Sequence, residues 1–121
     1  MIQAGAIALG LLFAVAGVTH FTSPGFYTRL LPLWLGGHRQ WVAFTGALEI
    51  ACGALLLLPG TRALGGALAV VLLLAFLLVH VNMLVDREAG LGLPRWALGL
   101  RLAFQFVLLA WAWTYAAPLF A

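Results

Sequence analysis

Four long apolar stretches dominate the pattern of hydrophobic and polar positions along this chain. They cover about residues 2–21, 41–58, 63–84 and 96–116. Each is close to the roughly 20 apolar residues that an α-helix needs to cross the hydrocarbon core of a bilayer. We therefore predict an all-α protein with four membrane-spanning helices. They use most of the 121 residues, so residues 1–121 form a single transmembrane domain.

The connections between these stretches are short. Short connections make successive helices antiparallel neighbours, which predicts an up-down four-helix bundle. Pro59 and Gly60 predict a tight turn between the second and third helices. Gly90, Gly92 and Pro94 interrupt the chain before the fourth helix in the same way.

The first connection, about residues 24–37, has a different character. It is too apolar for a free loop, and Pro24 and Pro32 interrupt it too often for a membrane span. An interfacial or re-entrant segment that covers one mouth of the bundle fits this pattern best. The residues that we expect to form this lid are Phe26, Arg29 and Trp34.

Composition supports an integral membrane protein. The chain is 65% hydrophobic and only 7% charged, so a soluble domain of this size could not cover its surface with polar groups. The net charge of +3 comes from six arginines against three acidic residues. These arginines lie mainly at the ends of the predicted helices, where lipid headgroups attract them. We therefore predict the lipid bilayer, and no nucleic acid, as a partner.

The arginines also predict an orientation. Arg29 and Arg39 lie in the first connection and Arg87 and Arg95 in the third, whereas the second connection holds Arg62 alone. Because cytoplasmic connections carry the excess of basic residues, we place the first and third connections in the cytoplasm. Both termini then lie outside a bacterial-type inner or plasma membrane.

Glu49 is the only charged residue between 41 and 58. A charge at the centre of a spanning helix costs about 2.5–3.5 kcal/mol on insertion scales, so a partner inside the protein is expected. Arg101 and Gln105 lie on one face of the fourth helix, because they are separated by four residues. We predict that the guanidinium of Arg101 pairs with the carboxylate of Glu49.

Polar residues gather in the half of the membrane that faces the first and third connections. This arrangement predicts a ligand-binding site there, with unknown catalytic residues. The candidate site residues are His20, Glu49, Asn82, Arg101 and Gln105.

Each candidate also has a structural interpretation. A buried Glu49–Arg101 pair could simply join two helices, and Gln105 and Asn82 could form hydrogen bonds between helices. His20 could instead bond a backbone carbonyl near its helix end. His80 and Asn82 differ by about 200° around a helix, so only one of them is expected to face the interior. We expect His80 to be interfacial.

Metal and thiol chemistry find little support in the sequence. Cys52 is the single cysteine, so no internal disulfide can form, and a buried structural role is expected. No histidine or cysteine cluster has the spacing of a metal site, and a haem held by His20 and His80 is disfavoured. We therefore predict no metal. The small residues Gly46 and Gly53 flank Glu49 and predict close packing within the bundle rather than dimerisation.

Several segments together resemble the DoxX family, specifically its short membrane proteins. Residues 17–24 read GVTHFTSP, residues 29–35 RLLPLWL, residues 45–50 TGALEI and residues 101–105 RLAFQ. They are similar to the family stretches GxxHFxxP, RIxPxWLP, SGxxEI and RLPLQ. His80 stands where the family pattern has proline. The resemblance therefore favours Asn82 as the inward residue and makes His80 a poor candidate for a family-wide role.

The resemblance implies a four-helix bundle associated with thiosulfate:quinone oxidoreduction and membrane redox complexes. Our first hypothesis is a redox-associated membrane subunit that binds a quinone or a similar apolar molecule. No cofactor is encoded, so electrons would come from a partner subunit. The family is also distantly similar to an animal chaperone for receptor assembly, so the second hypothesis is a non-enzymatic assembly protein. The third is a small proton-coupled transporter. An oligomer is possible in each case.

Overall fold

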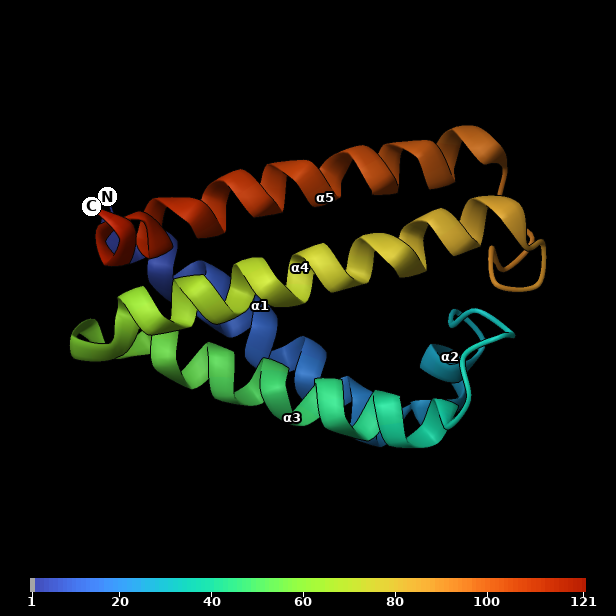
Figure 1. Cartoon of the computed structure of the whole chain (residues 1–121), viewed down its shortest axis with the longest axis horizontal. Helices are drawn as coiled ribbons and strands as arrows, with labels where there is room; N and C mark the ends of the chain where they lie inside the picture. The colour runs from blue at the N-terminus through green and yellow to red at the C-terminus, as the bar shows by residue number, and fades with distance from the viewer. Residues whose placement is uncertain (1) are drawn as a thin grey trace.

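The computed structural model describes residues 2–121, and the regular structure in this range is entirely helical (Figure 1). The long helices are α1 (Ile2–Thr22), α3 (His38–Leu57), α4 (Arg62–Val85) and α5 (Arg95–Ala116). All four are long and apolar enough to cross a membrane. The prediction of four such helices is confirmed, although α3 begins at His38 rather than near residue 41.

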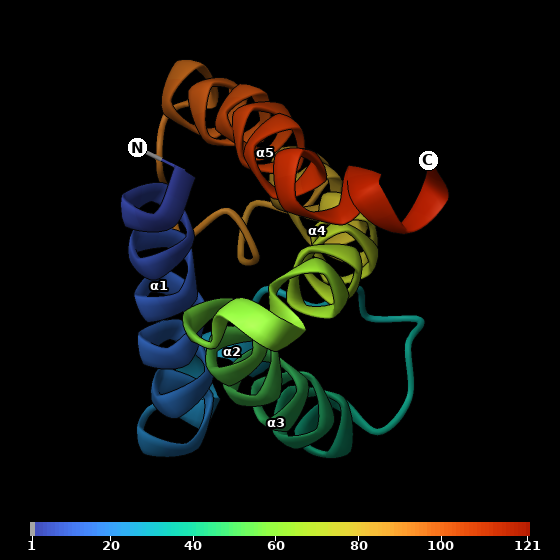
Figure 2. The same cartoon turned by 90° about the vertical axis from the view of Figure 1, so that its left-hand side faces the viewer.

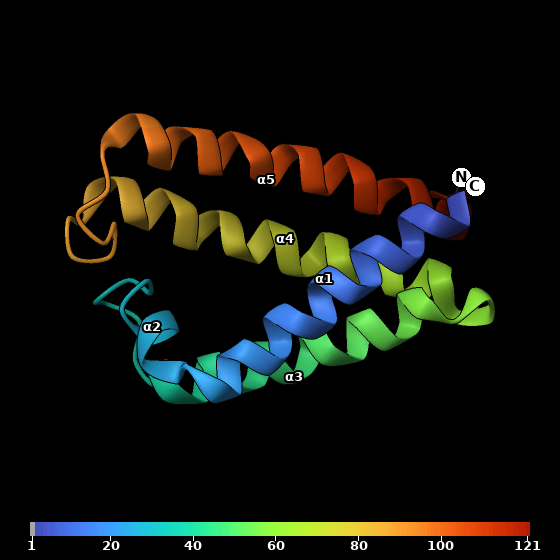
Figure 3. The same cartoon turned by 180° about the vertical axis from the view of Figure 1, so that it is seen from behind.

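Three short helical elements complete the chain. They are α2 (Pro24–Thr28) and the 3₁₀ helices η1 (Pro59–Thr61) and η2 (Ala117–Phe120). Both termini and η1 lie at one end of the bundle, whereas α2 and the connection between α4 and α5 lie at the other (Figures 1 and 3). Successive long helices are therefore antiparallel, which confirms the up-down topology.

The long helices form two pairs, α1 with α3 and α4 with α5 (Figure 2). The pairs meet mainly through α3 and α4. They lie close together near the termini and diverge toward the end that carries α2 (Figures 1 and 3). This divergence separates the two helix pairs where the polar candidates of the sequence lie.

Glycines allow α1 and α3 to approach closely. A Cβ atom added at Gly17 would lie 2.6 Å from the carbonyl oxygen of Gly46, and one added at Gly53 would lie 2.6 Å from that of Gly10. Larger residues would therefore push the helix backbones apart. The small residues pack within the bundle, as their spacing predicts.

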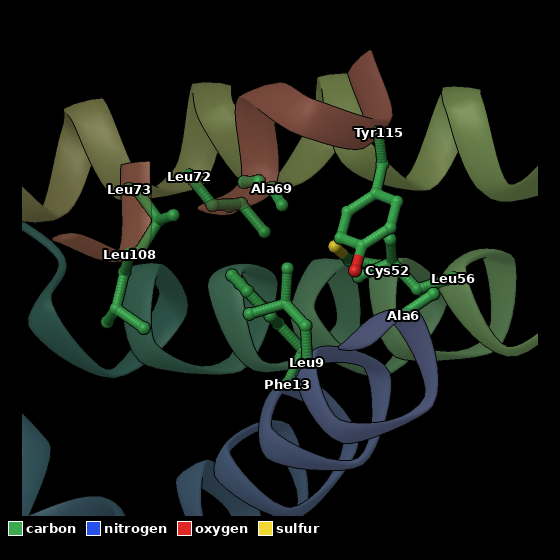
Figure 4. Packing of buried hydrophobic residues seen from close by; sticks show 11 residues of the cluster. Ala6, Leu9, Phe13, Cys52, Leu56, Ala69, Leu72, Leu73, Leu108 and Tyr115 are labelled. Atoms are coloured by element: carbon green, nitrogen blue, oxygen red, sulfur yellow. The ribbon is translucent and has the colours of Figure 1, made fainter. Parts of the chain in front are cut away.

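The main hydrophobic core fills the part of the bundle nearer the termini (Figure 4). Leu9 of α1, Leu56 of α3 and Leu72 of α4 are buried there. Cys52 lies in the same core and is fully buried, and its Sγ atom lies 3.3 Å from the carbonyl oxygen of Gly65. The prediction that this cysteine is buried is confirmed.

A second, smaller core lies at the opposite end. Leu30 from the first connection packs with Met83 of α4, Ala89 of the α4–α5 connection and Leu98 of α5. This cluster ties the first connection to the diverging ends of α4 and α5. It therefore holds the residues after α2 over the space between the two helix pairs.

Candidate ligand-binding site

An open cavity of about 650 Å³ lies between the two helix pairs at the end that carries α2. All four long helices and the residues that follow α2 contribute to its wall. Most of its lining is apolar, including Phe26, Trp41 and Phe76. The polar lining residues are His20, Tyr27, Thr45, Glu49, His80 and Arg101.

Glu49 pairs with His20 in this wall. The Nδ1 atom of His20 lies 3.0 Å from the Oε2 atom of Glu49, and both residues are buried. Gly46 precedes Glu49 by almost one turn, and a Cβ atom there would lie 2.6 Å from the Cβ of His20. The close crossing of α1 and α3 therefore brings the two side chains together.

The prediction that Arg101 pairs with Glu49 is wrong. A guanidinium nitrogen of Arg101 instead donates a hydrogen bond to the Oε1 atom of Gln105 at 3.3 Å, and the guanidinium lies 5.7 Å from the centre of the Phe104 ring. The two helix pairs diverge at this level, which keeps α5 away from α3. The sequence located the two charges at a similar depth but could not show this divergence.

One oxygen of Glu49 keeps an unused hydrogen-bonding capacity. The Nδ1 atom of His20 also lies 2.8 Å from the carbonyl oxygen of Ala16, and this contact has hydrogen-bond geometry. A neutral imidazole carries only one N–H group, so His20 donates to Ala16 when that proton is on Nδ1. The buried Oε2 atom of Glu49 has no hydrogen-bond partner among the described residues.

Tyr27 of α2 covers His20 and was missed by the sequence reasoning. The two rings are stacked, with centroids 3.9 Å apart and an angle of 15° between their planes. The Tyr27 hydroxyl lies 2.6 Å from the hydroxyl of Thr19, one residue before His20. The available signal was an aromatic residue with a polar tip in a segment that was already expected to cover the bundle.

Gln105 supports the site from outside the cavity. It is fully buried, and its Nε2 atom donates a hydrogen bond to the carbonyl oxygen of Leu73 at 2.8 Å. Its Oε1 atom accepts the hydrogen bond from Arg101. Gln105 thus joins α5 to α4 and orients Arg101, as its structural interpretation suggested.

Only one of His80 and Asn82 lines the cavity, but it is His80, so the choice of Asn82 as the inward residue and of His80 as interfacial is wrong. Asn82 donates a hydrogen bond from Nδ2 to the carbonyl oxygen of Leu30 at 2.9 Å, so it holds the first connection and does not line the cavity. His80 lines the cavity, and its buried Nδ1 atom has no hydrogen-bond partner in the described part of the chain. A helical wheel considers one helix alone, so it could not show that Asn82 binds the first connection while His80 faces the cavity.

The lid differs from its predicted composition. Phe26 lines the cavity, but Arg29 and Trp34 are exposed and do not contribute to its wall. Trp34 is 74% exposed. The cover consists instead of α2 and the turns after it, where Pro32 is buried and Leu30 belongs to the smaller core. These turns leave the consecutive residues Leu33 and Trp34 exposed.

The site has no cluster typical of metal binding. Within residues 2–121, no group of three or more histidine, cysteine, aspartate or glutamate side chains is placed to hold an ion. Its polar groups are instead suited to hydrogen bonding. His20, Glu49, His80 and Arg101 could bind polar atoms of an organic molecule.

The fold and the cavity define a class of protein, a four-helix bundle whose long helices are apolar enough to cross a membrane, with a partly polar cavity at one end. Residues 9–116 match a family described as a domain of unknown function (DUF8561), and the chain belongs to this family. No curated protein and no solved structure matches the chain.

Proposed function

We propose that this protein is a membrane protein that binds a lipid-soluble small molecule with a polar head, such as a quinone, in the cavity between its helix pairs. The observation that carries this proposal is the Oε2 atom of Glu49, which is buried in the wall of a mainly apolar cavity without a hydrogen-bond partner. Leaving such a group unpaired costs about 1–3 kcal/mol or more. A ligand that pairs with it offsets this cost.

The size and lining of the cavity support the same ligand class. About 650 Å³ lies within the usual range for small-molecule sites, roughly 300–1,000 Å³. Such sites combine an apolar and aromatic wall with a few polar groups that orient the ligand. Here the apolar wall would receive a ring and its alkyl substituent, and a hydroxyl group of the polar head, which a quinone carries in its reduced form, would lie against Glu49 and His20.

The proposed role is that of a redox-associated membrane subunit. Glu49 and His20 can exchange protons with a quinone oxygen, since carboxyl and imidazole groups serve as general acids and bases. The chain encodes no redox centre of its own, so a partner subunit would supply or accept the electrons. The resemblance to the DoxX family supports this role, and membership of that family is part of the proposal.

The test is the replacement of Glu49 by Gln, which preserves the size of the side chain but removes its charge. We expect the purified wild-type protein in mild detergent to carry a lipophilic molecule that mass spectrometry detects, and Glu49→Gln to lose most of it. Glu88→Gln is the matched control, because Glu88 is exposed on the α4–α5 connection. Equal retention by Glu49→Gln would contradict the site. An empty bundle that co-purifies with a specific membrane complex would favour the assembly alternative.

The orientation of the chain is also proposed. The four arginines of the first and third connections, against one in the second, support a cavity mouth on the cytoplasmic side with both termini outside. Cysteines introduced one at a time at Gly36 and Gly60 test this in intact cells, because no atom lies within 4 Å of a Cβ added at either position and the native Cys52 is fully buried. A membrane-impermeant maleimide should label residue 60 from outside and residue 36 only after permeabilisation. The reverse labelling pattern would show that the chain has the opposite orientation.

A further inference from the structure

The polar groups of the cavity are divided between its two walls. His20 and Glu49 belong to the wall formed by α1 and α3, whereas His80 and Arg101 belong to the wall formed by α4 and α5. In the described chain, the close contact between His20 and Glu49 lies within the first wall, and no salt bridge joins the two walls. The cavity therefore has an acidic side and a basic side that face the same space.

On the basic side, the protein does not use all the hydrogen-bonding groups of Arg101 and His80. Arg101 lies six residues beyond Arg95, about 9 Å along α5 from its start, where a charged side chain is costly in a membrane. In the described chain it contacts the neutral amide of Gln105 and the ring of Phe104. The neighbouring His80 keeps a buried Nδ1 atom without a hydrogen-bond partner in the same cavity.

The acidic side requires a hydrogen-bond donor. The Nδ1 atom of His20 has hydrogen-bond geometry with the carbonyl oxygen of Ala16 and not with Glu49. The described chain therefore provides no donor to the Oε2 atom of Glu49. A carboxylate only accepts hydrogen bonds, whereas a guanidinium only donates them. The acidic side thus requires a hydrogen-bond donor on the ligand, and the basic side requires an acceptor.

We infer that the ligand has a two-ended polar head that bridges the helix pairs. A hydroxyl group at one end donates to the Oε2 atom of Glu49, and an oxygen at the other end accepts hydrogen bonds from Arg101. This inference rests on the proposed function and narrows its ligand class to ring compounds that carry a hydroxyl group and a second, opposite oxygen. A reduced para-quinol meets this requirement, and an oxidised quinone lacks the donor.

The experiment compares three compounds on the purified full-length protein in detergent: an alkyl para-hydroquinone under anaerobic reducing conditions, its monomethyl ether and its dimethyl ether. The first two keep a hydroxyl donor, and all three keep two oxygens. A hydrogen bond to a charged group corresponds to about a tenfold to hundredfold difference in affinity. We therefore expect the dimethyl ether to bind at least tenfold more weakly than the other two.

Two variants test which residue binds each end of the polar head of the ligand. Glu49→Gln should reduce the preference for hydroxyl compounds severalfold, because charge-assisted hydrogen bonds are roughly twice as strong as neutral ones. Arg101→Gln should weaken the binding of all three compounds and leave the preference for hydroxyl compounds intact. Arg39→Gln is the control, since Arg39 is exposed in the first turn of α3 and does not line the cavity.

The outcomes separate the inference from the proposed function. If none of the three compounds binds, the proposed quinone-class function itself fails. If all three bind with equal affinity, or if the dimethyl ether binds best, the function stands and the two-ended head is overturned. A full hydroxyl preference in Glu49→Gln would also overturn the assignment of the donor to Glu49. Should that variant fail to fold, the wild-type series still decides whether a donor is required.

Discussion

At the scale of single residues, the notable feature is a buried carboxylate that has an imidazole beside it rather than a guanidinium. The distance of 3.0 Å between Nδ1 of His20 and Oε2 of Glu49 allows a charge interaction, but the hydrogen-bond geometry of Nδ1 favours Ala16. A buried pair with unsatisfied atoms is weak evidence for stabilisation, because desolvation offsets much of the attraction. The arrangement is better explained as a site for a polar ligand atom.

The stack of Tyr27 on His20 should contribute measurably to the stability of the site. Tyr27→Phe keeps the ring stack but removes the contact with the Thr19 hydroxyl, so we expect a loss of about 1 kcal/mol in the free energy of unfolding. Tyr27→Leu should cost about 0.5–1.5 kcal/mol more, because it also removes the aromatic pair. Thermal unfolding in detergent measures both. Equal destabilisation by the two variants would show that the stack contributes nothing.

At the scale of elements, the crossing of α1 and α3 positions the acidic side of the cavity. The sequence pattern of small residues predicted a close approach, and the structure shows where it occurs. Gly17 and Gly46 meet one turn or less from His20 and Glu49. The relative position of His20 and Glu49 therefore depends on two residues that have no side chain.

Gly46→Ala tests this dependence. The added methyl group would lie 2.6 Å from the Cβ of His20, so α1 and α3 must separate, at a cost of about 1–3 kcal/mol. Ligand affinity should fall as well, because His20 moves relative to Glu49. Unfolding and ligand binding in detergent provide the two measurements.

Gly99→Ala provides the matched control. No atom lies within 4 Å of a Cβ added there in α5, and alanine stabilises a helix by up to about 1 kcal/mol relative to glycine. We expect unchanged or slightly higher stability and unchanged binding. If Gly46→Ala behaves like this control, the close crossing does not position the pair.

At the scale of the whole molecule, the cavity exists because two tightly packed helix pairs diverge at one end. The core near the termini holds the pairs together (Figure 4). The smaller core around Leu30 and Leu98 holds the first connection over the opening. The hydrogen bond from Asn82 to the carbonyl oxygen of Leu30 fastens this cover to α4.

Asn82→Ala should loosen the cover without unfolding the bundle. The carbonyl oxygen of Leu30 would lose its side-chain donor, so we expect faster hydrogen exchange in the peptides that contain residues 29–35 and little change in α3 and α5. The same experiment on Val81→Ala serves as the control, because Val81 is an exposed neighbour on the same helix. Unchanged exchange in the cover would show that apolar packing alone holds it.

The sequence alone established the four helices, their up-down order and the half of the bundle that contains the polar residues. These features follow from local hydrophobic runs, short connections and depth along each helix, which require no knowledge of neighbouring helices. It also identified the first connection as a cover and Cys52 as a core residue.

Only the tertiary structure decided which polar groups meet. The sequence paired Glu49 with Arg101 because they lie at similar depth, but the glycine crossing selects His20 and the divergence of the pairs removes Arg101. The helical wheel left the choice between His80 and Asn82 open and the resemblance favoured Asn82, yet in the structure His80 lines the cavity and Asn82 binds the first connection. Depth follows from counting residues, whereas partner choice depends on the angles and distances between helices, which packing determines.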